Sequence, residues 1–192
     1  MQHILLIDNF DSFTYNLVQL LTESGVSHQL HLVKNTATPD ELPVEINKVL
    51  ISPGPGLPSE SGNLMNLVDY YVRRCPLLGI CLGHQAIALY FGARLINLTH
   101  SAHGMKSSCY ATMDRDPIFN DIRMPTDCGR YHSWAVDRNT LPDELMVTST
   151  DASGIIMSLR HKSLPLTGLQ FHPESYMTTV GKKMMVNWLT SN

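Results

Sequence analysis

The sequence of 192 residues has few of the features that mark specialised classes of protein. Charged residues make up only 16% of it, the formal net charge is −3, and the absence of a basic cluster argues against nucleic acid as a partner. No apolar run approaches the ~18 residues of a membrane span, and a strand predicted from residue 3 leaves no room for a signal peptide. We therefore expect a cytoplasmic protein that binds neither membranes nor nucleic acids.

Cysteine is also scarce, with four residues, and no two of them have the Cys-x-x-Cys spacing of a metal site. A chain of this length can bury a core that needs no disulfides. We expect Cys75, Cys109 and Cys128 to be reduced packing or surface residues, and we expect no bound metal. The setting of Cys81 is different.

The order of apolar segments and turn signals predicts one α/β domain over residues 1–192. Ser12 is expected to cap a helix that carries an apolar stripe and ends at Gly25. From about residue 94 short strands with turns replace the earlier pattern. This order predicts an open, mostly parallel central sheet flanked by helices. The expected strands are 3–8, 29–33, 49–51, 77–80, 131–136, 145–148, 155–160 and 166–171, and the further helices are 64–72, 84–91 and 180–189.

Cys81 is the central residue of Gly79-Ile80-Cys81-Leu82-Gly83, at the end of a short apolar strand. Glycines two residues on either side of a nucleophile permit the tight strand-to-helix turn called a nucleophile elbow. The helix that follows presents unpaired N–H groups, which favour the reactive thiolate. A lone cysteine is more often a structural residue, but this frame favours a nucleophile.

A base and a group to orient it are found in His172-Pro173-Glu174, directly after the strand expected at 166–171. Glu174 can bind one ring nitrogen of His172 and leave the other nitrogen for the sulfur. Nine histidines make a chance pairing easy, but a catalytic cysteine commonly has its histidine far downstream. We interpret Cys81, His172 and Glu174 as a candidate catalytic triad.

The segment Ser52-Pro53-Gly54-Pro55-Gly56 follows the strand at 49–51 and predicts a stiff loop with few side chains. Gly54 can offer a backbone N–H to a substrate, because the prolines cannot. Together with the N–H of Leu82, it can form an oxyanion hole. A plain turn that closes the strand is the alternative, and it would be favoured if this motif stood alone.

Together these segments resemble the class I glutamine amidotransferases. The resemblance covers essentially the whole chain, through the opening motif 6–17, the Pro/Gly loop, the elbow, and the segments 130–136 and 171–175. The opening motif and the segment 130–136 are similar to the small subunits of anthranilate synthase and aminodeoxychorismate synthase. The resemblance implies a flavodoxin-like α/β fold and a glutaminase activity.

The resemblance also implies roles for individual residues. Cys81 would attack the side-chain amide of glutamine, His172 would protonate the departing ammonia, and Glu174 would orient His172. Backbone groups of Gly54 and Leu82 would hold the oxyanion. The implied glutamine pocket consists of Gly54, Pro55, Gly56, Gln85, Ser133 and Trp134. The implied partner is a chorismate-utilising synthase subunit that uses magnesium and receives the ammonia, whereas this chain itself would need no cofactor.

Two positions depart from the family pattern. Trp134 stands where leucine is common, which can alter the shape of the pocket. Met105 stands where lysine is usual, in a stretch that lies close to the synthase partner in the family. The departures affect the expected pocket and interface and leave the triad intact.

Several alternatives stay open on the sequence alone. The choice between anthranilate and aminodeoxychorismate is made in the partner's active site, and we favour anthranilate. A redox-sensing or binding protein of similar fold would not need the triad and the pocket residues together. A cysteine peptidase or γ-glutamyl hydrolase would use the same thiol chemistry, but the segment 131–136 argues against it.

Overall fold

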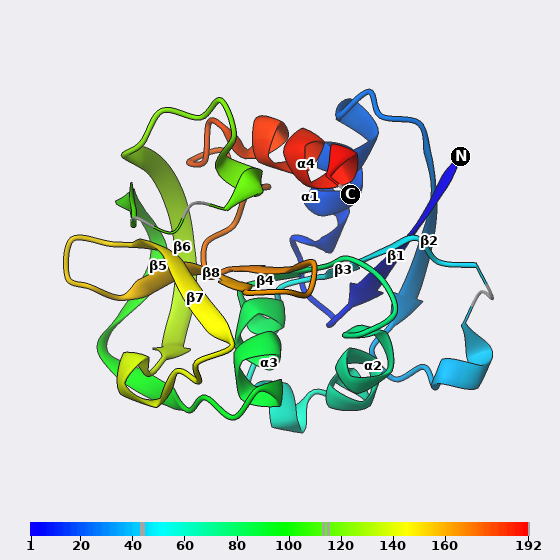
Figure 1. Ribbon diagram of the computed structural model, residues 1–192, viewed down its shortest axis with the longest axis horizontal. Coiled ribbons are helices and arrows are strands. Elements are labelled where there is room, and N and C mark those ends of the chain that lie inside the picture. Colours follow the sequence, from blue (N-terminus) through cyan, green and yellow to red (C-terminus); the bar gives the residue numbers. More distant parts are fainter. Residues whose placement is uncertain (43–44, 113, 115, 192) are drawn as a thin grey trace.

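The computed structural model describes residues 1–42, 45–112, 114 and 116–191. Within this part of the chain nine strands form one sheet, in the order β2-β1-β3-β4-β9-β8-β7-β5-β6 (Figure 1). The five neighbouring strands at one side pair in parallel, and they are β1 (Gln2–Asp8), β2 (His28–Lys34), β3 (Lys48–Ile51), β4 (Leu77–Ile80) and β9 (Leu166–Leu169). The remaining strands continue the sheet in antiparallel pairs, and they are β8 (Ile156–His161), β7 (Leu145–Thr150), β5 (Leu95–Ala111) and β6 (Thr126–Val136).

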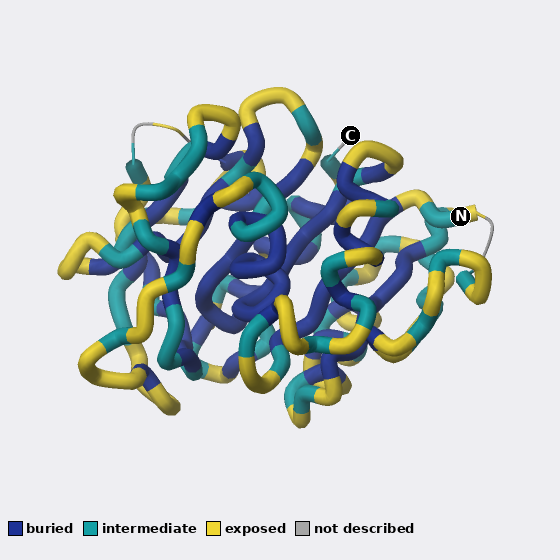
Figure 2. The backbone as a smooth tube through the Cα atoms, turned by 90° about the horizontal axis from the view of Figure 1, so that it is seen from below, coloured by how far each residue is buried: buried dark blue, intermediate teal, exposed yellow. Residues whose placement is uncertain are grey.

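Helices cover both faces of the parallel strands (Figure 1). Helices α1 (Thr14–Glu23) and α4 (Gly181–Thr190) lie on one face, and α2 (Leu64–Tyr71) and α3 (Leu82–Tyr90) lie on the other. Successive side chains of a strand point to opposite faces, so each central strand must be apolar at every position. In β1, Leu5 and Ile7 join the cluster formed with α2 and α3. Ile4 and Leu6 join the cluster formed with α1 and α4, and the sheet is buried between them (Figure 2).

The structure confirms the predicted α/β class, with a central parallel sheet flanked by helices. The predicted strands and helices of the first 93 residues are present with ends shifted by at most two residues. Short 3-10 turns complete the described chain at Pro39–Glu41, Pro58–Glu60, Pro117–Phe119 and Arg138–Thr140. No helix in the described ranges is both long and apolar enough to cross a membrane.

The predicted cap of the first helix is wrong. Helix α1 begins at Thr14 after Phe13, and the side chain of Ser12 makes no cap hydrogen bond there. Two carboxylates organise this turn instead, because Asp11 accepts the N–H of Phe13 at 2.7 Å and Asp8 accepts the Thr14 hydroxyl at 2.8 Å. Carboxylates compete well for such turn N–H groups.

The second half of the sheet differs from the short strands expected after residue 94. Strand β5 is 17 residues long, and it pairs with β6 through two register shifts, between Asn97 and Ala102 and between His103 and Met105. Much of β5 is exposed, so its sequence lacks the alternation that identifies a half-buried strand. The four cysteines are free and buried, which agrees with the packing role expected for Cys75, Cys109 and Cys128.

The burial of the central strands predicts where the chain is least tolerant of truncation. Leu50, in the middle of β3, is 0% exposed, whereas Leu32 on the edge strand β2 is 39% exposed. We expect Leu50→Ala to lower the free energy of unfolding by about 2–5 kcal/mol, and the matched control Leu32→Ala to cost much less. Urea unfolding of both variants checks this, and equal losses would contradict the assigned burial.

Candidate active site

The predicted site residues follow the carboxyl ends of the parallel strands. The Pro/Gly loop follows β3, the elbow follows β4, and the segment 170–174 follows β9. These strands are in register, with Ile51 paired to Gly79 and Gly79 paired to Gly168, so the three loops emerge at one edge of the sheet. Open α/β sheets bind their ligands at this edge.

The elbow predicted at Cys81 is present. Cys81 has φ 51° and ψ −97° between β4 and α3, a backbone conformation that costs of order 1–3 kcal/mol for a residue other than glycine. The turn is possible only because residue 79 is a glycine. A Cβ at Gly79 would lie 2.3 Å from the carbonyl carbon of Gly83 and would clash with it. The N–H of Cys81 donates to the carbonyl of Leu169 at 2.7 Å, which ties the elbow to β9. The thiol is buried and exposed by only 6%.

His172 and Glu174 form the predicted pair. His172 Nδ1 lies 2.7 Å from Glu174 Oε1, and the two side chains are 3% and 0% exposed. Burial alone would lower the pKa of His172, but the charge of Glu174 and the nearby Cys81 sulfur outweigh it and raise that pKa well above its usual value. His172 Nε2 has no hydrogen-bond partner within the described ranges. The arrangement therefore favours an imidazolium beside the sulfur, with one nitrogen available to it.

Two aromatic side chains that the sequence analysis did not assign to the site enclose His172. The rings of Tyr131 and Phe13 lie 4.9 and 5.9 Å from the imidazole, centroid to centroid, and 5.2 Å from each other. The Tyr131 hydroxyl lies 3.1 Å from the hydroxyl of Ser175. Phe13 lies directly before α1, and this position places its ring against the imidazole. These contacts hold the ring and restrict water around it.

The predicted glutamine-binding residues line one cavity next to the thiol. Its volume is about 230 Å³, smaller than the ~300–1,000 Å³ of sites for drug-sized ligands. Three lining residues were not predicted, namely His103, Tyr131 and His132. The others are Cys81 and the full predicted set of Gly54, Pro55, Gly56, Gln85, Ser133 and Trp134. This size suits a small amino acid.

Gly54 and Leu82, whose N–H groups are assigned to the oxyanion, pack closely against each other. A Cβ at Gly54 would lie 2.7 Å from the Leu82 side chain and 2.5 Å from Cβ of Asn9, so only glycine fits there. Leu82 is the first residue of α3, and the first N–H groups of a helix have no partner within the helix. Asn9, which the sequence analysis did not single out, holds the loop by donating from Nδ2 to the carbonyl of Ser52 at 2.8 Å.

A buried polar network forms the far wall of the cavity. Arg130 is paired with Asp151 at 2.6 Å and donates from Nε to His132 Nε2 at 3.1 Å. His132 therefore carries its proton on Nδ1 and donates it to the carbonyl of Trp134 at 2.8 Å. Burial, with the charge of Arg130, lowers the pKa of His132 to about 4, which keeps the ring neutral. Gln85 also donates to the Trp134 carbonyl, at 2.9 Å.

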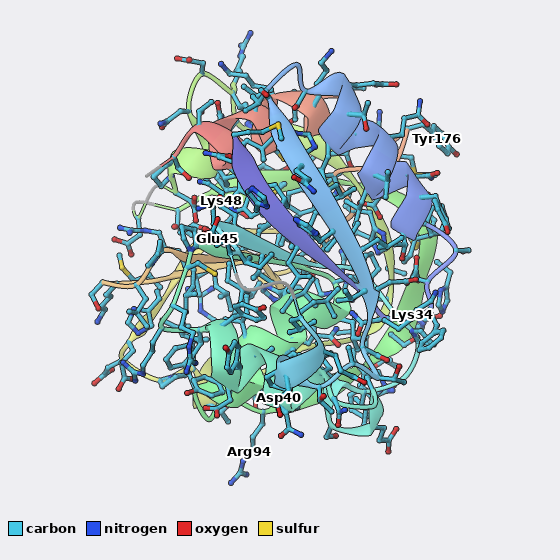
Figure 3. All side chains as sticks on the ribbon, turned by 90° about the vertical axis from the view of Figure 1, so that its right-hand side faces the viewer. Lys34, Asp40, Glu45, Lys48, Arg94 and Tyr176 are labelled. Atoms are coloured by element: carbon cyan, nitrogen blue, oxygen red, sulfur yellow. The ribbon has the colours of Figure 1, made fainter. Side chains whose placement is uncertain are left out.

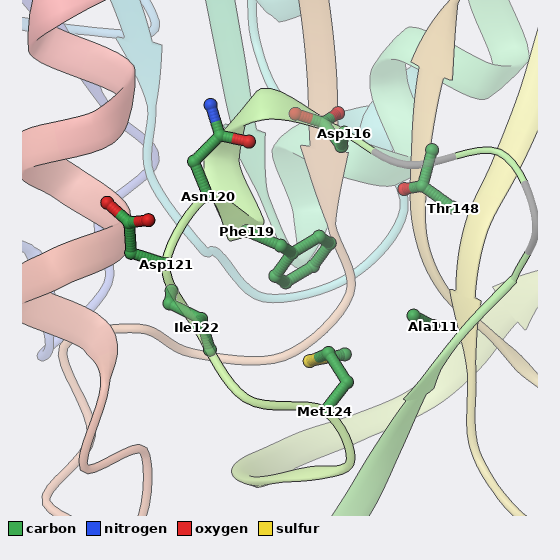
Figure 4. Close-up of a pocket in the computed structure, with 8 residues that line it drawn as sticks. All are labelled: Ala111, Asp116, Phe119, Asn120, Asp121, Ile122, Met124 and Thr148. Atoms are coloured by element: carbon green, nitrogen blue, oxygen red, sulfur yellow. The ribbon is translucent and has the colours of Figure 1, made fainter.

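A larger hollow of about 610 Å³ lies away from these residues (Figure 4). Phe119 and Met124 point into it, and Asp121 lies toward α4. Asp116 is already bound by Ile118 N–H and by the hydroxyl of Thr167. The Asp116 carboxylate is therefore already satisfied, and nowhere in the described ranges do three or more His, Cys, Asp or Glu residues form a group that could hold a metal ion.

Comparison with known proteins agrees with this geometry. The family model described as "Glutamine amidotransferase class-I" matches residues 5–191. This chain belongs to the class I glutamine amidotransferases. The family resemblance, the fold class and the enzyme class expected from the sequence are thereby confirmed.

Similar members of the glutamine amidotransferase family include two curated proteins. One, from Bacillus subtilis, is named aminodeoxychorismate/anthranilate synthase component 2 and is 42% identical over 97% of this chain and 95% of its own length. Another, from Cyanophora paradoxa, is named anthranilate synthase component 2 and is 40% identical over 97% of both chains. The crystal structure of a candidate GMP synthase subunit from Thermoplasma acidophilum has a TM-score of 0.85 at 28% identity, covering 98% of this chain and 92% of that one.

The charge of Glu174 predicts a pH effect on this amidotransferase. Glu174→Gln keeps a group that can accept a hydrogen bond from His172 but removes the charge that raises the pKa of His172. The imidazolium then loses its proton at lower pH, so we expect the alkaline limb of the kcat/KM profile for glutamine hydrolysis to move to lower pH. The control Glu60→Gln removes an exposed charge near Gly56 and should leave the limb in place. An unmoved limb in Glu174→Gln would contradict the assigned interaction.

The tight packing of Gly54 predicts a loss of turnover. A methyl group in Gly54→Ala would displace the loop from Leu82, so we expect kcat for glutamine hydrolysis to fall about 10²–10³-fold, the usual effect of losing one oxyanion donor. Gly154→Ala is the control for strain outside the cavity, because a Cβ there meets nothing within 4 Å but the backbone has φ +88°. Steady-state glutaminase kinetics with both variants provides the test, and wild-type kcat in Gly54→Ala would rule out this loop as a donor.

Proposed function

We propose that this chain is the glutaminase subunit of anthranilate synthase, which hydrolyses glutamine and passes the ammonia to a chorismate-utilising partner. One observation carries the proposal: the elbow thiol of Cys81 and the six predicted pocket residues line the same small cavity, and the His172–Glu174 pair lies against that thiol. The names of the B. subtilis and C. paradoxa relatives support the choice of synthase.

In the proposed reaction the Cys81 thiolate attacks the side-chain carbonyl carbon of glutamine. The C=O π electrons move to oxygen, and the N–H groups of Gly54 and Leu82 hold the resulting oxyanion. His172 donates its proton to the amide nitrogen, the C–N bond breaks, and ammonia departs. The enzyme is left as a glutamyl thioester on Cys81. His172 then takes a proton from water, whose oxygen attacks the thioester. Collapse of that intermediate breaks the C–S bond, releases glutamate and regenerates the thiolate.

The pocket wall supports glutamine as the substrate. Both hydrogens of Gln85 Nε2 are used, since this nitrogen donates to the carbonyl of Trp134 and to Gln170 Oε1. Gln85 Oε1 is left as an acceptor, which suits the ammonium group of an amino acid. The Trp134 contact uses its main-chain carbonyl, so the departure from leucine at this position leaves the contact unchanged.

The need for a partner follows from the product. Ammonia is largely protonated at neutral pH and diffuses away, so a synthase that uses it needs a docked glutaminase and a shielded route. Three large apolar side chains close to site residues are exposed, with Phe10 at 58%, Met105 at 53% and Tyr176 at 84%. Tyr176 projects from one edge of the molecule (Figure 3). Large exposed apolar side chains in segments that also carry site residues are consistent with an interaction surface.

The second candidate is the amidotransferase subunit of aminodeoxychorismate synthase, or a subunit shared by both enzymes. The name of the B. subtilis relative includes both activities. In either case the chorismate chemistry, and the magnesium it needs, belong to the partner, and this chain needs no cofactor. Co-purification of this chain with the chorismate-utilising proteins of its own organism distinguishes the candidates.

The division of labour predicts the outcome of removing the thiol. In the complex with its partner, we expect Cys81→Ser to abolish glutamine-dependent product formation, because a serine hydroxyl is a much weaker nucleophile than a thiolate. Ammonia-dependent formation should continue at the wild-type rate. Product assays with each nitrogen source on the purified complex provide the test. Loss of both activities in an intact complex would contradict the proposal.

A further inference from the structure

A fully buried amide lies between the nucleophile and the glutamine pocket. Gln170 directly follows β9, is 0% exposed, and donates its main-chain N–H to the carbonyl of Met157 at 2.9 Å. Its Nε2 lies 3.6 Å from Cys81 Sγ, within hydrogen-bond distance for a sulfur acceptor, and its Oε1 lies 3.2 Å from Gln85 Nε2. The chain bends after β9, and the segment that carries Gln170 also carries His172, whose imidazole lies beside the same sulfur.

The hydrogen-bond network fixes which end of the Gln170 amide faces the sulfur. Arg130 is always protonated, so His132 must accept from it and donate to the carbonyl of Trp134. That carbonyl can only accept, and it therefore fixes the Gln85 amide with Nε2 toward it. The same Nε2 faces Gln170, which must present its oxygen there and its N–H group to the sulfur.

We propose that Gln170 is a catalytic residue of the glutaminase reaction, whose side-chain N–H stabilises the Cys81 thiolate while its carbonyl oxygen holds Gln85 in the orientation that binds glutamine. The inference rests on the proposed function and deepens it. A hydrogen bond to an ionised acceptor is stronger than one to a neutral acceptor, so this donor favours the thiolate over the thiol. The thiolate is needed twice, as the attacking group and again as the group that leaves the thioester.

A merely structural amide would affect stability and leave the reactivity of Cys81 unchanged. The first variant is Gln170→Met, which has similar length but neither a donor nor an acceptor amide. The second is Gln170→Glu, which keeps an acceptor oxygen for Gln85 and replaces the sulfur-facing N–H with an oxygen. The matched control is Gln2→Met, the same substitution at a glutamine whose amide binds the carbonyl of Leu189 away from the site.

The measurement is the rate of alkylation of Cys81 by iodoacetamide as a function of pH, with the modified residue identified by peptide mass spectrometry. We expect the midpoint of the profile to move to higher pH by about one unit in Gln170→Met, so that alkylation below the midpoint is about tenfold slower. The shift should be larger in Gln170→Glu, whose carboxylate also places a negative charge beside the sulfur. The midpoint in Gln2→Met should equal that of the wild type. An unchanged midpoint in Gln170→Met would overturn the role at the sulfur.

Glutaminase kinetics of the complex separate the two ends of the amide. Gln170→Met should lower kcat and raise KM for glutamine, because both contacts are lost. Gln170→Glu should lower kcat with a KM close to that of the wild type, because Gln85 keeps its acceptor. Equal KM values in the two variants would overturn the role toward Gln85. The alkylation profile needs neither glutamine nor a partner, so it tests Gln170 even if the proposed function fails.

Discussion

The close approach of β4 and α3 at the elbow is the constraint on which the rest of the site depends. Gly79 brings β4 so near to α3 that a Cβ there would overlap the backbone of Gly83, and Gly83 in turn lies as close to Ile51 of β3. Cys81 is consequently held in a left-handed conformation at the start of the helix. The strain is maintained by the packing of the buried sheet, and it places the thiol at the carboxyl edge where the other loops end.

The hydrogen bond from the Cys81 N–H to Leu169 connects this constraint to the rest of the reaction. It joins the nucleophile to β9, whose continuation carries first Gln170 and then His172. The bridge between His172 and Gly129 then connects that segment to β6, which supplies Tyr131 and the network behind the pocket. The nucleophile and its base thus follow the neighbouring strands β4 and β9, and the bridge from His172 brings the pocket wall on β6, at the far end of the strand order, against them.

The sequence was sufficient for those parts of the molecule that depend on local patterns. Continuous apolar runs and paired glycines identified β1, β3, β4 and the elbow, because burial on both faces and a tight turn each leave few residue choices. The long strand β5 was missed because its exposed residues show no alternation. Ser12 was misassigned because Asp11, the residue before it, accepts the N–H of Phe13 and Asp8, at the end of β1, accepts the hydroxyl of Thr14. The roles of Asn9, His132 and Gln170 depend on tertiary contacts, which no local pattern in the sequence indicates.

The central claim is that the elbow thiol is the group that attacks glutamine. An electrophilic glutamine analogue, carrying a chloroketone in place of the side-chain amide, tests it directly when peptide mass spectrometry locates the label. We predict one label per chain, on Cys81, with labelling slowed by glutamine and abolished in Cys81→Ser. Labelling of Cys75, Cys109 or Cys128, or no label on a preparation that still hydrolyses glutamine, would contradict the account.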